Sequence, residues 1–343
     1  MRARDLVLRH GWHATAYQIL NPGITYWFSA ADEGVVGYVT RRGVCVVAGA
    51  PVCAEGDLDR ISREFEETCH ARGLRVCYFG AEDRLRATLA ARAAHTAVLL
   101  GAQPWWNPST WSRMVRCQAS VRAQLHRARN KGVRVREWSV AQLQSERGVR
   151  RCLEEWLETR GLPPLHFLVE PRTLGRLFDR RAFVACREGV VVGFLVASPI
   201  PTRNGWLIEQ IIRGRGAPNG AAELMVNAAM EQLARSGASH VSLGLAPLSR
   251  HAGVPGADQS GWLSLSFRVA RAAGGRFYNF QGLDRFKSKM HPDGWEGVYA
   301  ITDEPQFSLR SLRAIAAAFT GASPIRAIAA GVARRLRHAL PGM

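Results

Sequence analysis

Residues 205–235, GWLIEQIIRGRGAPNGAAELMVNAAMEQLAR, decide the fold class of this 343-residue chain. Residues 205–213 are rich in β-branched and aromatic side chains, which predicts a strand. The glycine-rich turn 214–220 follows, and Asn219 is placed to cap a helix over residues 221–235. Amide groups at the start of such a helix have no partner within it and attract anions. The order of strand, glycine-rich turn and helix therefore predicts an α/β fold with an anion-binding turn.

Short strands and helices alternate along the rest of the chain. We expect strands at residues 26–28, 34–40, 44–48, 75–79, 133–138 and 240–245, a hairpin over residues 182–198 and a helix over residues 57–72. Both halves repeat a strand–strand–helix–strand order, which predicts a diverged duplication. A turn-rich break at Pro104 to Pro108 separates the halves. The sequence thus predicts four parts: an N-terminal unit (1–112), a basic connecting helix and strand (113–138), a C-terminal unit (139–304) and a tail (305–343).

The chain is strongly basic. It has 46 Lys and Arg residues against 28 Asp and Glu residues, a net charge of +18, which predicts a polyanionic partner such as nucleic acid or anionic lipid. A helix expected from Arg113 to Lys131 carries six of these cations and no acidic residue. Its buried side is expected to hold Val121, Leu125 and Ala128. Such a helix is either a solvated connection between domains or a surface that binds phosphates. Because solvated helices usually mix charges, we favour phosphate binding, through Arg122, Arg127, Arg129 and Lys131.

The tail after Glu304 contains six arginines and no acidic residue. Two helices are expected, with apolar faces formed by Leu309, Leu312, Ile315 and Phe319 and by Ile325, Ile328, Val332 and Leu336. Basic amphipathic helices lie on anionic membranes; the alternative is a helix packed on the protein with its arginines in water. We favour the membrane, and expect a protein without residues 306–343 to keep its fold. No run reaches the roughly 20 apolar residues that a transmembrane helix needs, so the predicted association is peripheral.

The cysteine pattern and the N-terminal residues predict the cellular compartment of the protein. Seven cysteines are scattered along the chain without the C-x-x-C spacing of a zinc site. The sequence therefore predicts no metal, and no cofactor is expected. An odd number of scattered thiols is typical of a reducing compartment, and the N-terminal MRARDLVLRHGW lacks the apolar core of a signal peptide. We expect a cytoplasmic protein that associates with the inner face of the cell membrane.

A second unusual stretch, residues 274–299, reads GGRFYNFQGLDRFKSKMHPDGWEGVY. It holds two of the three lysines in the chain, Lys287 and Lys289. If residues 285–291 are extended, Lys287, Lys289 and His291 share one face and form a row of cations. The alternative is a solvated edge strand whose charges prevent aggregation. The stretch alone leaves these two interpretations open.

Three runs together resemble a known family. APNGAAELMV, then SLGLAPLS, then FYNFQGLDRFKSKMHPDGWEGVY are similar to the C-terminal catalytic domain of the lysyl- and alanyl-phosphatidylglycerol synthases (the multiple peptide resistance factor family). The resemblance extends over residues 20–302. It implies tandem Gcn5-related acetyltransferase-like domains that move an aminoacyl group from aminoacyl-tRNA onto a lipid hydroxyl without coenzyme A. The multi-helix flippase domain that usually precedes this domain has no counterpart in these 343 residues.

The resemblance also implies site residues. Family members tend to carry Asp-x-x-Arg on the strand before the glycine-rich turn. In this sequence the arginine is present as Arg213, but Gln210 occupies the position of the aspartate. The neighbouring Glu209 is expected to point to the opposite face of the strand. This leaves the transferred amino acid open. Candidate substrate-binding residues are Gln210, Asn219, Glu223, Tyr278 and Asn279. Candidate catalytic residues are Arg213, Lys287, Lys289, Glu296 and His291. The cationic residues would bind phosphates or a tetrahedral oxyanion. His291 or Glu296 would accept the hydroxyl proton, unless Glu296 simply pairs with a neighbouring cation.

The resulting hypothesis is a tRNA-dependent aminoacyltransferase that acts on phosphatidylglycerol, with aminoacyl-tRNA and anionic phospholipid as partners. One alternative is an acyl-CoA-dependent N-acyltransferase that uses the turn from Arg213 to Gly220 to bind pyrophosphate. A second alternative is a non-catalytic relative that binds tRNA or lipid. Ser249 lies in no nucleophile-elbow pattern, so serine hydrolase chemistry is excluded.

Overall fold

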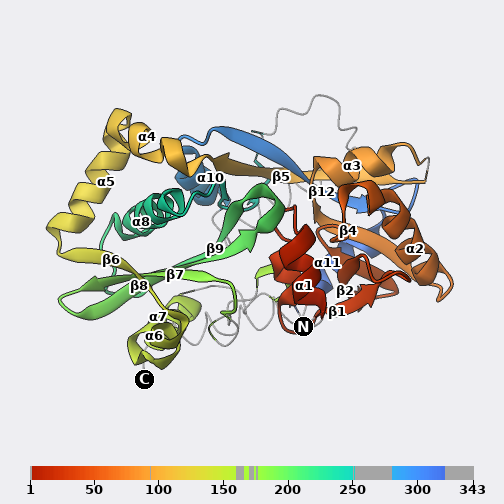
Figure 1. Ribbon diagram of the computed structural model, residues 1–343, viewed down its shortest axis with the longest axis horizontal. Helices are drawn as coiled ribbons and strands as arrows, with labels where there is room; N and C mark the ends of the chain where they lie inside the picture. The colour runs from red at the N-terminus through yellow and green to blue at the C-terminus, as the bar shows by residue number, and fades with distance from the viewer. Residues whose placement is uncertain are drawn as a thin grey trace, which may run out of the picture.

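The computed structural model describes residues 2–92, 94–159, 166–169, 174, 177–249, 251 and 280–320. Its strands form one mixed sheet in the order β1-β2-β3-β4-β12-β5-β10-β9-β8-β7-β6, with β11 paired to β5 beside that path. Helices cover both faces (Figure 1). The predicted α/β class, with mixed strands flanked by helices, is confirmed.

The N-terminal half supplies the first strands of the sheet. Its strands are β1 (Thr25–Phe28), β2 (Val35–Arg41), β3 (Val44–Ala48), β4 (Arg75–Ala81) and β5 (Thr96–Trp106). Its helices are α1 (Arg2–His10), α2 (Leu58–His70) and α3 (Asp83–Ala90), with the 3-10 helix η1 (Tyr17–Leu20). Pro104, Trp105 and Trp106 belong to β5, so the turn-rich break predicted at Pro104 is wrong for these residues.

The C-terminal half supplies the remaining strands. Its elements are α4 (Trp111–Cys117), α5 (Ala119–Asn130), β6 (Val133–Trp138), α6 (Val140–Ser145), α7 (Arg147–Glu158), β7 (Arg181–Arg187), β8 (Val190–Ile200), β9 (Gly205–Arg213), α8 (Ala221–Arg235), β10 (His240–Ser242), β11 (Ala246–Pro247), α10 (Phe280–Ser288) and β12 (Gly294–Thr302). β12 lies between β4 and β5 and is antiparallel to both. The last strand therefore completes the sheet of the N-terminal half. The division of the chain into four parts remains a prediction.

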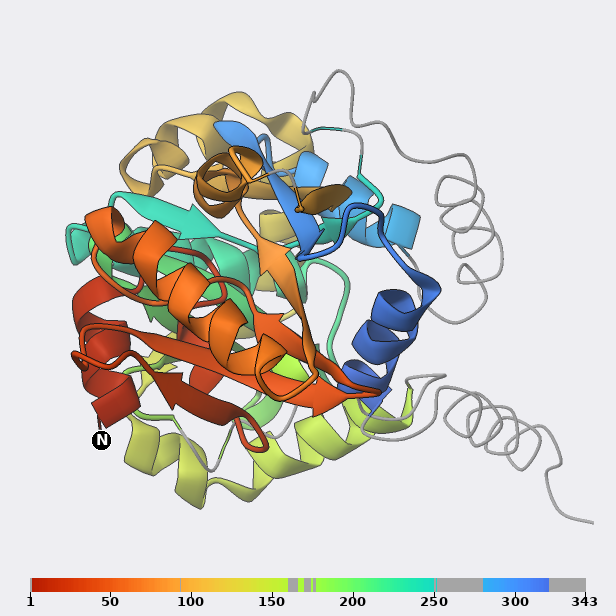
Figure 2. The ribbon, with the colours of Figure 1, turned by 90° about the vertical axis from the view of Figure 1, so that its right-hand side faces the viewer.

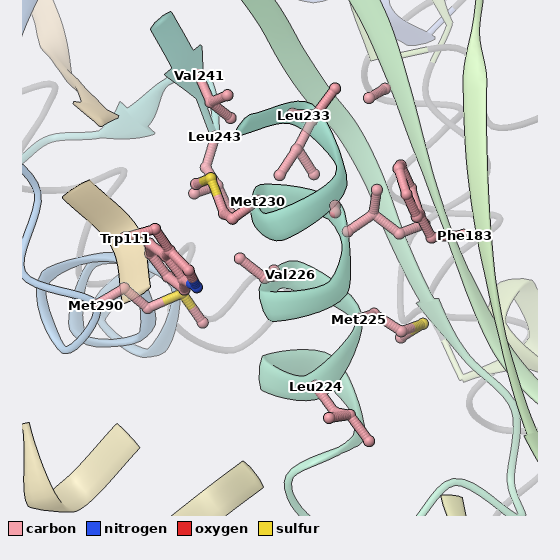
Figure 3. Packing of buried hydrophobic residues seen from close by; sticks show 14 of the residues in the cluster. Trp111, Phe183, Leu224, Met225, Val226, Met230, Leu233, Val241, Leu243 and Met290 are labelled. Atoms are coloured by element: carbon pink, nitrogen blue, oxygen red, sulfur yellow. The ribbon is translucent and has the colours of Figure 1, made fainter. Parts of the chain in front are cut away.

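Helix α8 forms the centre of the larger core in the C-terminal half. Val226, Met230 and Leu233 are buried on it and belong to one core with Val241 in β10 and Leu243 just after β10. Figure 3 shows Met290, which follows α10, beside Trp111 and facing α8. The opposite face of β7–β9 packs against α7 through Val149 and Cys152. The end of α10 is thus fixed to the same core as α8.

The predicted basic helix is two helices. It breaks at Gln118, whose φ of −98° and ψ of 98° are extended, between α4 and α5. Val121, Leu125 and Ala128 are buried against α8, as predicted. The segment therefore belongs to the core of the C-terminal half, and the prediction of one continuous helix from Arg113 to Lys131 is wrong.

The first tail helix also packs on the protein. Helix α11 (Leu309–Thr320) lies against β2 and β3 (Figure 2, dark blue helix). Ile315 is buried, while Leu312 and Phe319 pack against the same cluster; Leu309 is 53% exposed. The prediction that these four residues form a membrane-facing surface is therefore wrong, because the sheet covers three of them. The second predicted helix, residues 325–336, lies outside the described residues.

Candidate functional site

Strands β9 and β10 run in parallel but separate after three residue pairs. Residues 240–242 pair with residues 205–207. β9 then continues to Arg213 beside β8, whereas the chain after Ser242 turns away and pairs as β11 with β5. We call the place where the two strands diverge, between residues 208–213 and 243–245, the sheet split. The carboxyl end of a parallel strand where neighbouring strands diverge is a common ligand site in α/β proteins.

The glycine-rich turn after β9 uses its amides internally. The amide of Gly214 donates to Val192 O (2.9 Å) and that of Ala217 to Gly214 O (3.1 Å). The amide of Arg215 donates to the Glu155 carboxylate (2.8 Å). These three amides are therefore not free to bind an anion in the way that the sequence predicts. The Glu155 carboxylate would also repel a phosphate at this turn.

Lys287 lies at the sheet split and is buried. Residues 280–288 form α10, so the extended conformation considered for residues 285–291 is wrong, and Lys287 and Lys289 do not share a face. Lys287 is 3% exposed, and its Nζ donates to Gly244 O (2.7 Å) and Leu245 O (2.9 Å). Burial lowers the pKa of Lys287 to about 7. A neutral amine has two N–H groups, which match these two carbonyls. Lys287 thus holds one side of the split in place.

The other predicted cations lie nearer to solvent. Lys289 Nζ is 3.3 Å from Glu223 Oε1, in the first turn of α8. Arg213 and Asn219 are exposed at the two ends of the glycine-rich turn. His291 is exposed in a turn with φ of +46°. Glu223 and Lys289 therefore lie at the start of α8 and Arg213 at the end of β9, apart from the buried amine of Lys287.

A β-bulge changes the predicted face of Glu209. The ladder between β8 and β9 shifts register so that Gln210 lies opposite Val196 and Ile208 opposite Ala197, which leaves Glu209 as the extra residue. Ile208 and Ile211, three residues apart, both pack on the α8 side. Glu209 and Gln210 therefore both lie on the other side, and the prediction that they face opposite ways is wrong.

The carboxylate of Glu209 is already neutralised. Arg180 Nε lies 2.9 Å from Glu209 Oε1 and Arg180 Nη2 3.3 Å from Oε2. Both side chains are buried, with 2% and 7% exposure. Arg180 also donates to Asn21 Oδ1 (3.1 Å), which links this pair to the N-terminal half. A substrate ammonium would therefore compete with a buried guanidinium for Glu209.

Glu296 belongs to a partly buried ionic cluster between the two halves. Arg203 Nη1 is 2.9 Å from both Glu296 oxygens, and Arg203 Nη2 is 2.6 Å from Glu82 Oε2. Gln103 Nε2 donates to Glu82 (2.8 Å) and Glu296 (3.1 Å). Burial raises the pKa of Glu82, and burial beside Arg203 lowers the pKa of His240 to about 4. The arrangement is that of a structural junction, which favours the ion-pair interpretation of Glu296.

A basic surface runs along α4, α5 and β6 to the start of α8. Residues 111–136 contain eight basic residues and no acidic one. Seven of them are exposed: Arg113, Arg116, Arg127, Arg129, Lys131, Arg134 and Arg136. Arg122 instead donates to Arg116 O and Val115 O at the end of α4. Within the described part of the chain none of the eight forms an ion pair. A Cβ at Gly220 would lie 2.2 Å from Gln124 O, so α5 touches the start of α8.

Comparison with known proteins identifies the family. The model of the phosphatidylglycerol lysyltransferase C-terminal domain matches residues 4–302. The chain belongs to this family. A transferase of the lysylphosphatidylglycerol synthase type is therefore supported, and the resemblance stated from the sequence is confirmed.

Relatives of this phosphatidylglycerol lysyltransferase-family domain share its fold at low identity. The C-terminal domain assigned to lysylphosphatidylglycerol synthetase from Agrobacterium fabrum has a TM-score of 0.79 at 21% identity, over 93% of this chain and 96% of that one. L-PGS from Bacillus licheniformis has a TM-score of 0.76 at 19% identity, over 98% and 96%. An uncharacterized protein of Corynebacterium glutamicum is 23% identical over 88% of this chain. This chain spans 39% of the length of that curated relative.

Some residues of the lysyltransferase-family site lie outside the described part of the chain, and others were not predicted from the sequence. Tyr278 and Asn279 lie outside the described residues. Within the described ranges, no group of three or more His, Cys, Asp or Glu side chains is placed to hold a metal, and no helix is long and apolar enough to span a bilayer. Sequence reasoning missed Glu82, Gln103, Arg203 and His240. No local motif marks them, because they meet Glu296 only through the pairing of β5 with β10 and β12.

Replacement of Glu296 by glutamine tests its role in this lysyltransferase-family domain. We expect transfer activity to fall less than about tenfold, because a neutral amide keeps one oxygen for Arg203. Loss of a general base would instead lower the turnover by ~10²- to 10⁴-fold. The turnover should be measured across pH together with the unfolding temperature. A drop of 100-fold or more in a normally folded variant, with the acidic limb of the pH profile removed, would restore Glu296 as the base.

Proposed function

We propose that this domain transfers an aminoacyl group from aminoacyl-tRNA to a hydroxyl of phosphatidylglycerol at the inner face of the membrane. The observation that carries the proposal is the basic surface of α4, α5 and β6, which is free of ion pairs within the described residues and reaches the start of α8. Unpaired cations in this number are suited to the phosphates of a nucleic acid. The start of α8 borders the sheet split, so a bound tRNA would have its 3′ end near the split.

The glycine-rich turn supports tRNA over acyl-CoA as the donor. An acyl-CoA enzyme of this fold class would need turn amides directed at a pyrophosphate. Here the amides of Gly214, Arg215 and Ala217 donate to protein acceptors, and the acceptor of Arg215 is the Glu155 carboxylate. Binding of pyrophosphate would have to displace these contacts and would place like charges together.

The proposed reaction is an ester exchange. The lipid hydroxyl oxygen attacks the ester carbonyl carbon, the hydroxyl proton passes to a base, and the 3′ oxygen of the tRNA leaves and takes up a proton. Because the aminoacyl ester is already activated, the protein contributes mainly orientation and stabilisation of the tetrahedral oxyanion. Lys289, which pairs with Glu223 in the first turn of α8, and Arg213, at the end of β9, are proposed to stabilise negative charge. Lys287 is proposed as a positioning residue, since it holds the carbonyls of Gly244 and Leu245.

Charge reversal on the basic surface tests the donor. We expect Arg127→Glu/Arg129→Glu/Lys131→Glu to weaken tRNA binding and to lower the salt slope by up to roughly 0.7–0.9 per lost phosphate contact. Arg122 is left unchanged because it caps α4. A matched control, Arg9→Glu/Arg72→Glu/Arg235→Glu, makes the same change in net charge at exposed sites elsewhere. Equal tRNA affinity and slope in both triple variants would remove this surface from the site, and saturable acetyl-CoA binding without tRNA binding would favour the rival donor.

A native thiol offers a second readout of the same surface. Cys117 is exposed at the end of α4, whereas the other six cysteines are buried or half-buried. A bound tRNA should therefore slow maleimide modification of Cys117. A rate unchanged by saturating tRNA would place the tRNA elsewhere.

A further inference from the structure

Two apolar side chains protrude beside η1. Phe178 is 66% exposed and Val169 is 50% exposed. The Tyr17 hydroxyl donates to Phe178 O, and Asn21 Nδ2 donates to Phe167 O (2.9 Å). Tyr17 begins η1 and Asn21 is its C-cap, so both segments are bound to the same short helix. The exposed side chains Val169 and Phe178 thus lie on two segments bound to η1, and the exposed Pro22 follows its C-cap; we call these three side chains the η1 face.

The end of α11 lies at this face. The His166 amide donates to Phe319 O (2.9 Å), and the rings of Phe167 and Phe319 meet edge to face at 5.5 Å. The chain continues from Thr320 for 23 residues that include four arginines, Arg326, Arg334, Arg335 and Arg337, and no acidic residue. A strongly basic segment is thus joined to the protein beside the exposed apolar side chains.

Two described carboxylates beside the η1 face, Asp179 and Glu209, are paired with arginines. Asp179, next to Phe178, is bound by Arg4 Nε (2.7 Å), and Glu209 is bound by Arg180. No free carboxylate of these residues opposes an anionic surface. A second copy of the chain is a poor occupant, because each copy would bring its own basic segment to the contact at a net charge of +18.

We propose that the η1 face is the surface through which this protein rests on an anionic bilayer. The proposal rests on the proposed lipid acceptor and names the part of the fold that meets the lipid. Exposed aromatic and aliphatic side chains enter the acyl boundary, while the arginines of the sequence that continues from Thr320 would attract anionic headgroups. In Figure 1, α5 lies at one end of the molecule and α1 and α11 toward the other. The bilayer and the proposed tRNA surface would therefore not compete for the same elements.

Vesicle binding by charge variants tests this surface. We expect Val169→Glu/Phe178→Glu to weaken co-sedimentation with vesicles of phosphatidylglycerol and phosphatidylcholine by about tenfold or more, since carboxylates oppose both apolar burial and the anionic surface. The matched control Val140→Glu/Val190→Glu changes two side chains that are 37% and 50% exposed on α6 and β8. It should bind vesicles as the unmodified protein does. Unfolding temperatures show that both variants fold.

A site-directed probe keeps the test independent of stability. In a Cys117→Ser background, an environment-sensitive dye at Phe178→Cys should shift to the blue on addition of phosphatidylglycerol vesicles, whereas the same dye at Val190→Cys should not. Equal vesicle binding by the two double variants, or no shift at position 178, overturns the proposal. These assays contain no tRNA. Loss of aminoacyl transfer with retained, position-178-dependent vesicle binding would therefore contradict the proposed function alone.

Discussion

Replacement of Lys287 by methionine is expected to lower aminoacyl transfer by ~10²-fold or more, whereas Lys289→Met has a smaller effect. Lys287 is 3% exposed and binds two carbonyls at the sheet split, whereas Lys289 is partly exposed and paired with Glu223. Methionine fills much of the volume but leaves the carbonyls of Gly244 and Leu245 without a donor. Displacement of a site by about 1 Å can lower a rate by ~10²-fold. Arginine should rescue little, because its larger, planar and always charged group does not fit a buried site matched to a lysine amine.

The pH dependence of stability gives a readout that does not depend on catalysis. The pKa of Lys287 is lowered by burial to about 7, below its ordinary value of 10.5. Between these two values the unfolded chain binds the proton and the folded protein does not, so the free energy of unfolding from this group rises with pH. Below about pH 7 Lys287 is protonated in both the folded and the unfolded state, so the folded protein bears the full cost of burying its charge. Compared with Lys287→Met, the unmodified protein should gain stability from pH 7 to pH 10.

Two results would contradict this account of Lys287. One is parallel stability curves for the unmodified protein and Lys287→Met between pH 7 and pH 10. The other is full transfer activity in folded Lys287→Met, with the loss found in Lys289→Met instead. Both variants should be assayed for kcat and KM separately, because a positioning residue acts mainly on kcat.

Removal of residues 306–343 is expected to destabilise the protein severely, in contrast to removal of residues 321–343. The longer deletion takes away Phe307 and Ile315, which are 5% and 8% exposed in the core of the N-terminal half. Burial of two such side chains contributes roughly 3–6 kcal/mol, a large part of the 5–15 kcal/mol typical of a folded protein. The deletion also removes the ring contact between Phe319 and Phe79 and the hydrogen bond that Arg310 donates to Arg42 O. The unfolding temperature should fall by on the order of 10 °C or more.

Point variants in α11 separate packing from charge. Ile315→Asp buries a carboxylate in an apolar cluster and should reproduce much of the loss. Arg313→Asp, on the exposed side of the same helix, should change the unfolding temperature little. A protein without residues 306–343 that unfolds at the unmodified temperature would show that α11 adds nothing to the core.

Local sequence patterns were sufficient for the regular elements. Residues 44–48, 205–213 and 221–235 form the strands and helix that their composition predicts. The pattern is ambiguous at residues 285–291, where Phe286 and Met290 are four apart and suit a helix face as well as their alternation with lysines suits a strand. Packing decides it, because Phe286 and Met290 both join the core around α8. The sequence did not reveal β5 because Pro104 reads as a turn residue; in the structure the Pro104 carbonyl accepts from Ser242 Oγ at 3.0 Å.

The candidate site was harder to predict because its contacts are distant in sequence. Lys287 binds carbonyls 42 and 43 residues earlier. Arg203 joins Glu82 and Glu296, which are 121 and 93 residues away. The face of Glu209 depends on a bulge set by the ladder with β8, and strict alternation along a strand cannot reveal such a bulge. The sequence therefore indicated which residue types matter, while strand pairing determined which of them meet.

The proposed function is tested most directly by following the aminoacyl group. The domain should be incubated with phosphatidylglycerol vesicles and, one at a time, tRNAs charged with each radiolabelled amino acid, and the lipids extracted and separated. We expect label in a new, positively shifted phospholipid for at least one amino acid, lost when the tRNA is uncharged or the lipid is phosphatidylcholine. No labelled lipid from any aminoacyl-tRNA, together with acyl transfer from acyl-CoA by the same preparation, would contradict the account.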